Sequence, residues 1–161
     1  MDNCKVAKYI VTKKEWRLLM IVKEIMTKNV VTVTPETPLR EAGKIFLEKR
    51  ISGIPVIDEK GALYGMVTIT DMLKVLDDIY KWGEQEKKLS GLKIAEEFAA
   101  KKANAKVGDI MSKDVFTLPD ESSLKDVMRM MFVKRVHTIP IVNGDKLVGV
   151  IGKHDLVSIC F

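Results

Sequence analysis

Polar side chains able to bind a ligand follow a strand-like run in the first half of the chain. A strand is expected to stop at Thr68, and a helix is expected to begin just beyond Asp71. The first backbone N–H groups of that helix and its positive dipole end would point into any adjacent cleft. Asp71 can accept hydrogen bonds from both hydroxyls of a ribose, while Thr68 and Thr70 offer hydroxyls to ribose or phosphate. This pattern indicates a site for a hydroxyl-rich or anionic ligand.

The same residue types also serve a purely structural role. Asp and Thr are common at helix N-termini, where their side-chain oxygens accept hydrogen bonds from backbone N–H groups. Asp71 and Thr70 are therefore equally consistent with a simple helix cap. Both interpretations stay open at the level of the local sequence.

Catalysis is not expected from this set of side chains. Nucleophilic catalysis needs an activated Ser or Cys beside a His, and Cys160 lies next to the C-terminus. Metal catalysis needs clustered ligands at a defined spacing, which two separate histidines and isolated carboxylates do not supply. The sequence therefore argues against an enzyme, a catalytic cofactor and a metal site.

The composition is that of a globular protein without a nucleic-acid-binding stripe. The 161 residues are 47% apolar and 30% charged, and their net charge of +5 comes from lysines and arginines scattered between acidic residues. Tracking a phosphate backbone needs a clustered basic surface, so no nucleic-acid partner is expected. The length allows one compact domain, or two small halves that share one core.

The termini and cysteines favour a cytoplasmic location. Cys4 and Cys160 lie at opposite ends of the chain, which suits a reduced intracellular protein. The apolar run from Leu18 to Val22 is far shorter than the roughly 20 residues needed to cross a bilayer, so no membrane association is expected. Whether Met20 is the natural start stays open.

The most informative feature is an internal repeat. The segment "EIMTKNVVTV" from Glu24 matches "DIMSKDVFTL" from Asp109, an offset of 85 residues, and Ile54-Pro55 meets Ile139-Pro140 at the same offset. After one deleted residue, "GMVTITDML" faces "GVIGKHDLV". Self-similarity over this length indicates two copies of one structural unit.

Each copy is expected to fold as β-α-β-β-α, which places the chain in the α/β class, of the α+β type. The pattern predicts an opening strand, a helix with apolar positions at helical spacing, a hairpin and a closing helix. The expected strands and first helices are Val30 to Val33, Pro38 to Lys49, Ile54 to Ile57 and Leu63 to Ile69, then Val115 to Leu118, Ser123 to Lys134, Ile139 to Val142 and Leu147 to Ile151. The predicted organisation is an N-terminal extension (1–21), a first repeat (22–79), a helical connector (80–105) and a second repeat (106–161).

The second copy departs from the first at its ligand-binding motif. Asp155 matches Asp71, but Gly152 replaces Thr68, so that a hydroxyl is lost. Lys153 and His154 follow, where the first copy has Ile69 and Thr70, so that positive charge is gained. His137 lies just before the second strand of this copy, and both histidines are consistent with ordinary surface or core positions.

The repeat resembles the cystathionine β-synthase (CBS) domain family. The resemblance covers Val22 to Ile79 and Lys106 to Phe161, and its marks are "IMT" and "IMS", "SGIPVID" and "HTIPIVN", and "GMVTITD" and "GVIGKHD". It implies two repeats packed about a pseudo-twofold axis. It also implies a non-catalytic regulatory module that binds AMP, ADP, ATP or S-adenosylmethionine in clefts between the repeats, and that forms a homodimer.

The resemblance also implies which residues line each cleft. A ligand in this family takes its ribose contact from one repeat and its phosphate contact from the other. The main site is therefore expected to contain Met66, Thr68, Thr70, Asp71, Lys113, Asp114, Val115, Phe116, His137, Lys153 and His154. A weaker second site, without a cation, is expected to contain Asp155, Val30, Ser52 and Gly53. Met66 and Val115 are equally well explained as core residues.

Two questions stay open. The chain can instead be a structural dimerisation module whose clefts are empty, since that alternative shares every feature of the fold. The identity of the nucleotide and of any effector protein is not determined. The homodimer is expected to form through apolar positions of the closing helices, namely Met72, Leu73, Val75, Leu76, Leu156, Val157 and Ile159.

Overall fold

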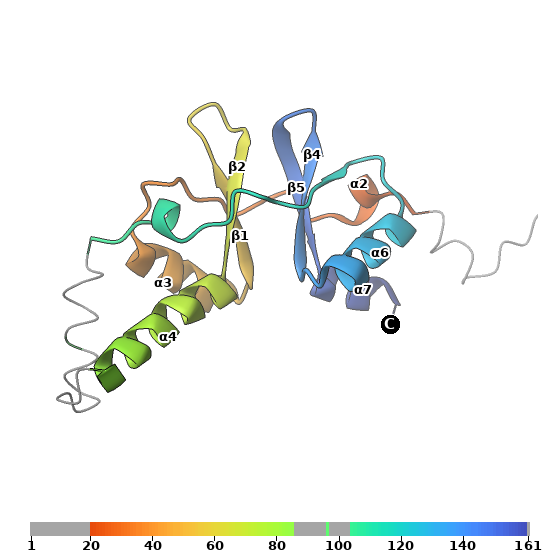
Figure 1. Cartoon of the computed structure of the whole chain (residues 1–161). Coiled ribbons are helices and arrows are strands. Elements are labelled where there is room, and N and C mark those ends of the chain that lie inside the picture. The colour runs from red at the N-terminus through yellow and green to blue at the C-terminus, as the bar shows by residue number, and fades with distance from the viewer. Residues whose placement is uncertain (1–19, 86–95, 97–103, 161) are drawn as a thin grey trace, which may run out of the picture.

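The computed structural model describes residues 20–85, 96 and 104–160 (Figure 1). The N-terminal extension, apart from its last two residues, and most of the helical connector lie outside the described residues. The helices are α2 (Val22–Ile25), α3 (Leu39–Lys49), α4 (Ile69–Gln85), α6 (Leu124–Lys134) and α7 (Lys153–Cys160), with one 3-10 turn, η1 (Val107–Asp109). The strands are β1 (Gly53–Ile57), β2 (Leu63–Thr68), β3 (Leu118–Pro119), β4 (Thr138–Asn143) and β5 (Lys146–Gly152).

Two hairpins stand next to each other at the centre of the molecule (Figure 1). Strands β1 and β2 form one antiparallel pair, and β4 and β5 form the other, joined by β3 in a three-stranded sheet. Helices α3 and α4 lie on one outer side, while α6 and α7 lie on the other. The expected α+β fold of two repeats is confirmed.

The opening strand of each repeat is shorter than the sequence predicts. Of the run from Val30 to Val33, only Val33 makes a β-bridge, to Val56, and of the run from Val115 to Leu118 only Leu118 lies in a strand. The prediction of two four-residue strands is therefore wrong. The physical reason is that Val30 and Val115 face cavities between the repeats rather than a neighbouring strand.

The closing helices begin earlier than predicted, before the aspartates rather than after them. Helix α4 begins at Ile69 and α7 at Lys153, so each Asp lies in the first helical turn. At α4, the Thr68 hydroxyl accepts a hydrogen bond from the Asp71 N–H at 3.3 Å, and the Asp71 carboxylate accepts one from the Thr68 N–H at 3.0 Å. This reciprocal cap satisfies backbone groups that a free helix end leaves without partners, so the helix begins at Ile69, before Asp71.

The opening segment of each repeat packs into the core of the other repeat. Val22 is fully buried among the apolar side chains of the second repeat, and Val107 is fully buried among those of the first. Backbone hydrogen bonds support both placements, since the Val22 N–H donates to the Ser122 carbonyl and the Val107 N–H to the Thr37 carbonyl, each at 2.8 Å. Figure 1 shows the same exchange, with α2 beside α6 and η1 beside α3. The two repeats therefore share one fold and do not form independent domains.

Two glycines allow the opening segments to cross the hairpins. Thr27 pairs with Val150 on β5, and Ser112 pairs with Met66 on β2. A Cβ atom at Gly65 would lie 2.9 Å from the Ser112 carbonyl oxygen, which is closer than real Cβ atoms approach. Gly149 meets Met26 and Thr27 in the equivalent way. The glycine in each "GM" or "GV" motif is thus required by the crossing backbone.

Among the described residues, no helix is both long and apolar enough to cross a membrane.

Candidate functional site

Two cavities lie between the repeats at equivalent places about the pseudo-twofold axis. The larger one, of about 810 Å³, is lined by Asp155 and by Thr27 and Val30 of the opening segment; we call it the Asp155 cleft. The smaller one, of about 520 Å³, is lined by Thr68 and Thr70; we call it the Thr68 cleft. Ser52, Ile69, His137 and Thr138 line both. The two clefts therefore meet at the axis, where the Ser52 and Thr138 hydroxyls lie 3.5 Å apart.

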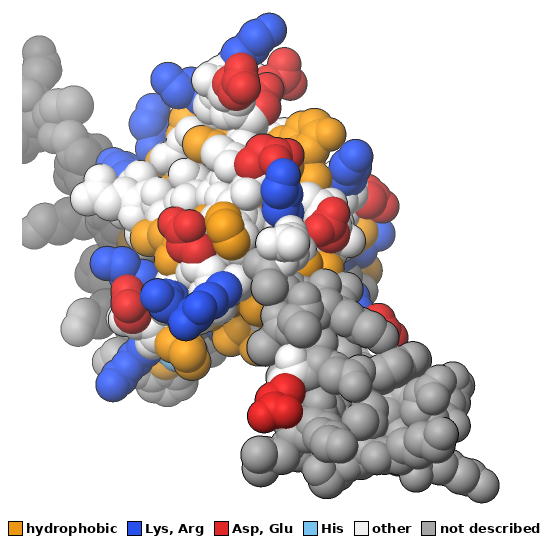
Figure 2. All heavy atoms as spheres, turned by 90° about the vertical axis from the view of Figure 1, so that its left-hand side faces the viewer, with side chains coloured by type: hydrophobic (Ala, Val, Ile, Leu, Met, Phe, Trp, Pro, Cys, Tyr) orange, Lys and Arg blue, Asp and Glu red, His pale blue; other side chains and the backbone are white. Residues whose placement is uncertain are grey.

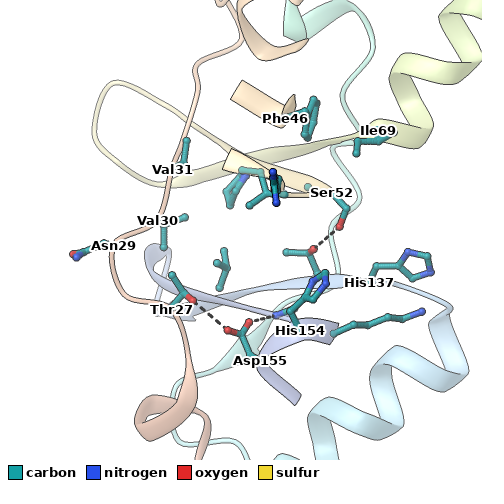
Figure 3. Close-up of a pocket in the computed structure, with 18 residues that line it drawn as sticks. Thr27, Asn29, Val30, Val31, Phe46, Ser52, Ile69, His137, His154 and Asp155 are labelled. Atoms are coloured by element: carbon teal, nitrogen blue, oxygen red, sulfur yellow. Dashed lines mark hydrogen bonds between the residues drawn. The ribbon is translucent and has the colours of Figure 1, made fainter. Parts of the chain in front are cut away.

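A half-buried carboxylate lies on one wall of the Asp155 cleft. Asp155 Oδ2 accepts a hydrogen bond from the Gly152 N–H at 2.6 Å, and Oδ1 accepts one from the Thr27 hydroxyl at 3.3 Å. Figure 3 shows Asp155 and His154 on this wall, with Phe46 and Ile69 on the opposite wall. A carboxylate offers about four acceptor positions, so Asp155 retains capacity to accept hydrogen bonds from a ligand.

Basic side chains surround the same cleft. Arg50, Lys153 and His154 line it and are exposed, and His137 lies where the two clefts meet. Arg50 ends α3 in the left-handed backbone conformation, with φ of 53°. A non-glycine residue in that conformation is uncommon, and here it turns the chain from the helix toward the cleft. The Asp155 cleft therefore combines a carboxylate with the charged side chains of Arg50 and Lys153 and with two histidines.

The remaining walls of the Asp155 cleft are apolar. They come from the opening segment, from α3, from the first hairpin and from β5, and consist of Val30, Val31, Phe46, Ile51, Pro55 and Val150. An apolar slot with a few convergent polar groups at its rim is typical of small-molecule sites.

The Thr68 cleft gathers most of the expected main-site residues. Of that set it is lined by Met66, Thr68, Thr70, Asp114, Val115, Phe116 and His137. Arg135 also lines it, in the left-handed conformation with φ of 54°, as the counterpart of Arg50. Met66 is 6% exposed and belongs to the wall as much as to the core.

Asp71 is the buried carboxylate beside the Thr68 cleft. Its side chain is occupied by its own helix, because the Thr68 hydroxyl donates to Oδ2 at 2.6 Å and the Lys74 ammonium to Oδ1 at 2.9 Å. Burial alone would raise the pKa of Asp71, but the hydrogen bonds from the Thr68 hydroxyl, Lys74 and the Thr68 N–H together hold it below 3.8. Asp71 is 5% exposed and is absent from the lining of the cleft, unlike Asp155.

Besides Asp71, three expected main-site residues do not line the Thr68 cleft. Lys153 and His154 line the Asp155 cleft, not the cleft that holds Thr68, because they begin the helix that contains Asp155 itself. The expectation that the Asp155 cleft has no cation is therefore wrong. Lys113 lines neither of the two clefts. Its ammonium lies 5.3 Å from the centre of the Tyr64 ring, and both side chains line a separate cavity. The other expected residues of the second site, Val30, Ser52 and Gly53, do line the Asp155 cleft.

The sequence analysis missed Arg50 and Arg135. Both follow a Lys at the end of the first helix of their repeat, so the matched Lys-Arg pairs carried a signal. The neighbouring sequence does not show the left-handed backbone turn that directs each Arg toward a cleft.

In the described part of the chain, no three His, Cys, Asp or Glu side chains group closely enough to hold a metal ion.

Comparison with known proteins identifies relatives of similar sequence. CBSX1 of Arabidopsis thaliana, described as chloroplastic, is 31% identical over 147 residues, which cover 84% of this chain and 62% of that protein. MJ1225 of Methanocaldococcus jannaschii is 28% identical over 138 residues, which cover 86% of this chain and 42% of that protein. The chain thus spans less than two thirds of the length of either relative.

Solved structures give the same fold. The CBS domain pair of MJ0100, in complex with 5′-methylthioadenosine and S-adenosyl-L-methionine, has a TM-score of 0.65 and 22% identity, covering 88% of this chain and 96% of that chain. CBSX2 in complex with AMP has a TM-score of 0.67 and 24% identity, covering 87% of this chain and 95% of that chain. At these identities the likeness concerns the fold.

The model of the family described as "CBS domain" matches residues 22–78 and 107–160, which together make up more than half of the sequence. These two segments coincide with the two repeats found in the sequence and in the structure. The chain therefore belongs to the CBS domain family and carries two copies of the domain in tandem.

Proposed function

We propose that this chain is a non-catalytic regulatory module that binds an adenosyl ligand in the Asp155 cleft. The observation that carries the proposal is that an accessible carboxylate, basic side chains and an apolar slot share one cavity of about 810 Å³. The ligands named for two relatives of the same fold, AMP for CBSX2 and S-adenosyl-L-methionine with 5′-methylthioadenosine for MJ0100, share an adenosine moiety. That shared moiety supports an adenosyl ligand here.

The polar groups of the cleft suit a phosphorylated nucleoside. The Asp155 carboxylate can accept hydrogen bonds from the two ribose hydroxyls, since within the described parts of the chain only the Gly152 N–H and the Thr27 hydroxyl donate to it. Arg50, Lys153 and His154 can meet phosphate oxygens, and Arg can do so with two parallel hydrogen bonds. The Thr68 cleft offers fewer cations and also contains Asp114, which repels a phosphate.

The base fits the apolar part of the cavity. Val30 and Val31 come from an irregular segment outside any strand. The Val30 N–H already donates to the Lys28 carbonyl at 3.0 Å, so the Val30 carbonyl and the Val31 peptide groups are the ones that can meet a purine edge. Ile51 and Pro55 form the facing apolar surface. Burying an aromatic ring between such side chains contributes roughly 25 cal/mol per Å² of apolar surface.

A homodimer is part of the proposal. Leu73 on α4 and Val157 on α7 are 55% and 57% exposed, and Leu76 is 40% exposed. Val75, in contrast, is buried within the chain and is not available to a partner. Figure 2 shows hydrophobic side chains at the surface among mixed acidic and basic ones on the end of the molecule that carries α3 and α4. Exposed apolar helix faces of this kind support association of two copies.

The output of the module stays a prediction. A regulatory role implies an effector protein or a further domain, neither of which this chain identifies. The cytoplasmic location expected from the sequence likewise stays a prediction. The competing function, a dimerisation module with empty clefts, is supported by the same exposed apolar side chains and differs only in ligand binding.

Calorimetric titration with AMP tests the proposal. A hydrogen bond to a charged group contributes about 1.5 to 3 kcal/mol, so Asp155→Ala should weaken AMP binding by about ten- to a hundredfold. The matched control is Asp126→Ala, because the Asp126 carboxylate caps α6 by accepting from the Ser123 N–H at 3.1 Å and its hydroxyl at 2.6 Å, away from both clefts. That variant should bind AMP as the unchanged protein does. Absence of binding of AMP, ATP and S-adenosylmethionine to the unchanged protein would instead favour the dimerisation module.

A further inference from the structure

The carboxylates of the two equivalent aspartates, Asp71 and Asp155, differ in how many hydrogen bonds they already accept from the protein. Asp71 receives three hydrogen bonds from its own helix turn, from the Thr68 N–H at 3.0 Å, the Thr68 hydroxyl at 2.6 Å and the Lys74 ammonium at 2.9 Å. The Lys74 bond is the one that satisfies Oδ1, the oxygen that the cap leaves free. With about four acceptor positions on a carboxylate, little capacity is left for two ligand hydroxyls.

In the second repeat neither of these two groups covers Asp155, and its Oδ1 accepts only the longer hydrogen bond from the Thr27 hydroxyl, at 3.3 Å, among the described residues. Gly152 stands where Thr68 stands and brings only its N–H, which donates to Asp155 Oδ2 at 2.6 Å. Ser158 stands where Lys74 stands, and its hydroxyl donates to the backbone carbonyl of Asp155 at 2.8 Å and leaves the carboxylate untouched. As a result Asp155 lines its cavity, whereas Asp71 does not line the neighbouring one.

We infer that Lys74 determines occupancy: its ammonium holds the Asp71 carboxylate and closes the Thr68 cleft to ligands that carry a vicinal diol, so that each chain binds one nucleoside, in the Asp155 cleft. The inference rests on the proposed adenosyl site. It adds a role for Lys74, a residue that lines neither cleft. It also sets the number of nucleosides bound per chain at one, where the repeat symmetry alone would predict two.

The geometry explains why a lysine can act in this way. The Lys74 side chain is 69% exposed, and an ion pair of this kind at the surface is weak when both partners are solvated. Asp71, however, is 5% exposed, so a ligand that displaced Lys74 would have to replace its charge-assisted bond with neutral hydroxyl donors in a partly desolvated place. Neutral donors are weaker partners for a carboxylate than an ammonium is, so the ammonium stays.

A pair of reciprocal substitutions tests the inference, with AMP as the probe in calorimetric titration. Lys74→Ser gives the first repeat the residue of the second, and should add a second AMP site per chain. That site should be weaker than the first, because the Thr68 cleft has fewer basic side chains and contains Asp114. Ser158→Lys places an ammonium one helical turn from Asp155, and should weaken the single site of the unchanged protein by about tenfold or more. Lys74→Arg keeps a cation and should keep the stoichiometry at one. Lys81→Ser removes an equivalent exposed lysine, paired with Asp77 further along α4, and should leave binding unchanged.

The outcomes separate this inference from the proposed function. Two AMP sites in the unchanged protein, or one site in Lys74→Ser, would overturn the role of Lys74 while leaving the adenosyl site standing. If no adenosyl compound binds at all, the proposed function fails. The bond between Lys74 and the Asp71 carboxylate is then tested without ligand, by a carbon-13 NMR titration of the Asp71 carboxyl. Lys74→Ser should move its titration midpoint to higher pH, because the Lys74 bond lowers the pKa of Asp71. An unmoved midpoint shows that Lys74 does not hold the carboxylate and overturns the inference.

Discussion

Val22 and Val107 occupy equivalent positions in the two repeats, 85 residues apart, and each is fully buried in the core of the repeat to which it does not belong. The exchange makes the stability of each half depend on the opening segment of the other. A protein built in this way should unfold as one unit, although its sequence divides cleanly into two copies.

The exchange of opening segments predicts crossed effects of core substitutions. Val22→Ala and Val107→Ala should each lower the free energy of unfolding by about 2 kcal/mol, from the lost burial of two methyl groups and the cavity left behind. Amide hydrogen exchange should then accelerate first in β4 and β5 for Val22→Ala, and in β1 and β2 for Val107→Ala. Acceleration confined to the repeat that carries the substitution would contradict the exchange.

The tight crossing at Gly65 predicts a substitution effect opposite in sign to that at a glycine inside a helix. Gly65→Ala should destabilise the fold by roughly 1 to 3 kcal/mol, because a Cβ there lies 2.9 Å from the Ser112 carbonyl oxygen and the backbone must shift. Gly43→Ala is the matched control, since a Cβ at this position in α3 makes an ordinary 3.6 Å contact with the Met72 methyl group. It should stabilise by about 0.5 to 1 kcal/mol, as expected for alanine in a helix interior. Urea denaturation measures both, and equal effects of the two substitutions would argue against a tight crossing.

The buried cap at Asp71 predicts a loss of stability in acid. The pKa of Asp71 is held below 3.8 in the folded state, so the ionised carboxylate stabilises the fold above its unfolded value, and this contribution disappears as the pH falls through the folded value. Asp71→Asn should therefore cost about 1 kcal/mol or more at neutral pH, the size of a hydrogen bond to a charged group. The difference from the unchanged protein should shrink as the pH is lowered from about 5 to below the folded pKa. Denaturant titrations at three pH values give the result, and a difference that stays constant would rule out this account.

The exposed apolar positions predict a dimer that charge can disrupt. The double variant Leu73→Asp and Val157→Asp should shift sedimentation velocity from a dimer to the 18.2 kDa monomer without loss of helical circular dichroism. Tyr64→Glu, on β2 and away from the closing helices, is 44% exposed and should leave the assembly unchanged. Detection of only the monomer in the unchanged protein at micromolar concentration would remove the dimer from the proposal.

Much of the architecture followed from the sequence because it is encoded over short distances. The hairpins and first helices appear within a residue or two of their expected bounds, since apolar periodicity and turn residues act locally. The match of "GMVTITD" with "GVIGKHD" identified Asp71 and Asp155 as equivalent, and the motifs identified the family. The opening strands were expected at four residues each and proved shorter, because their apolar side chains face a cavity that no local pattern reveals.

What only the tertiary structure decided is which side chains share a cleft. Lys153 and His154 were assigned across the axis, yet they begin the helix that contains Asp155 and stay beside it. The wall of the Asp155 cleft includes a hydrogen bond from Thr27, 128 positions away, to Asp155, whereas Asp71 is covered by Lys74 from the next turn of its own helix. Two copies of one motif thus acquire different sites. The reason is that accessibility of a carboxylate depends on every donor that the folded chain brings to it, and those donors come from any distance in the sequence.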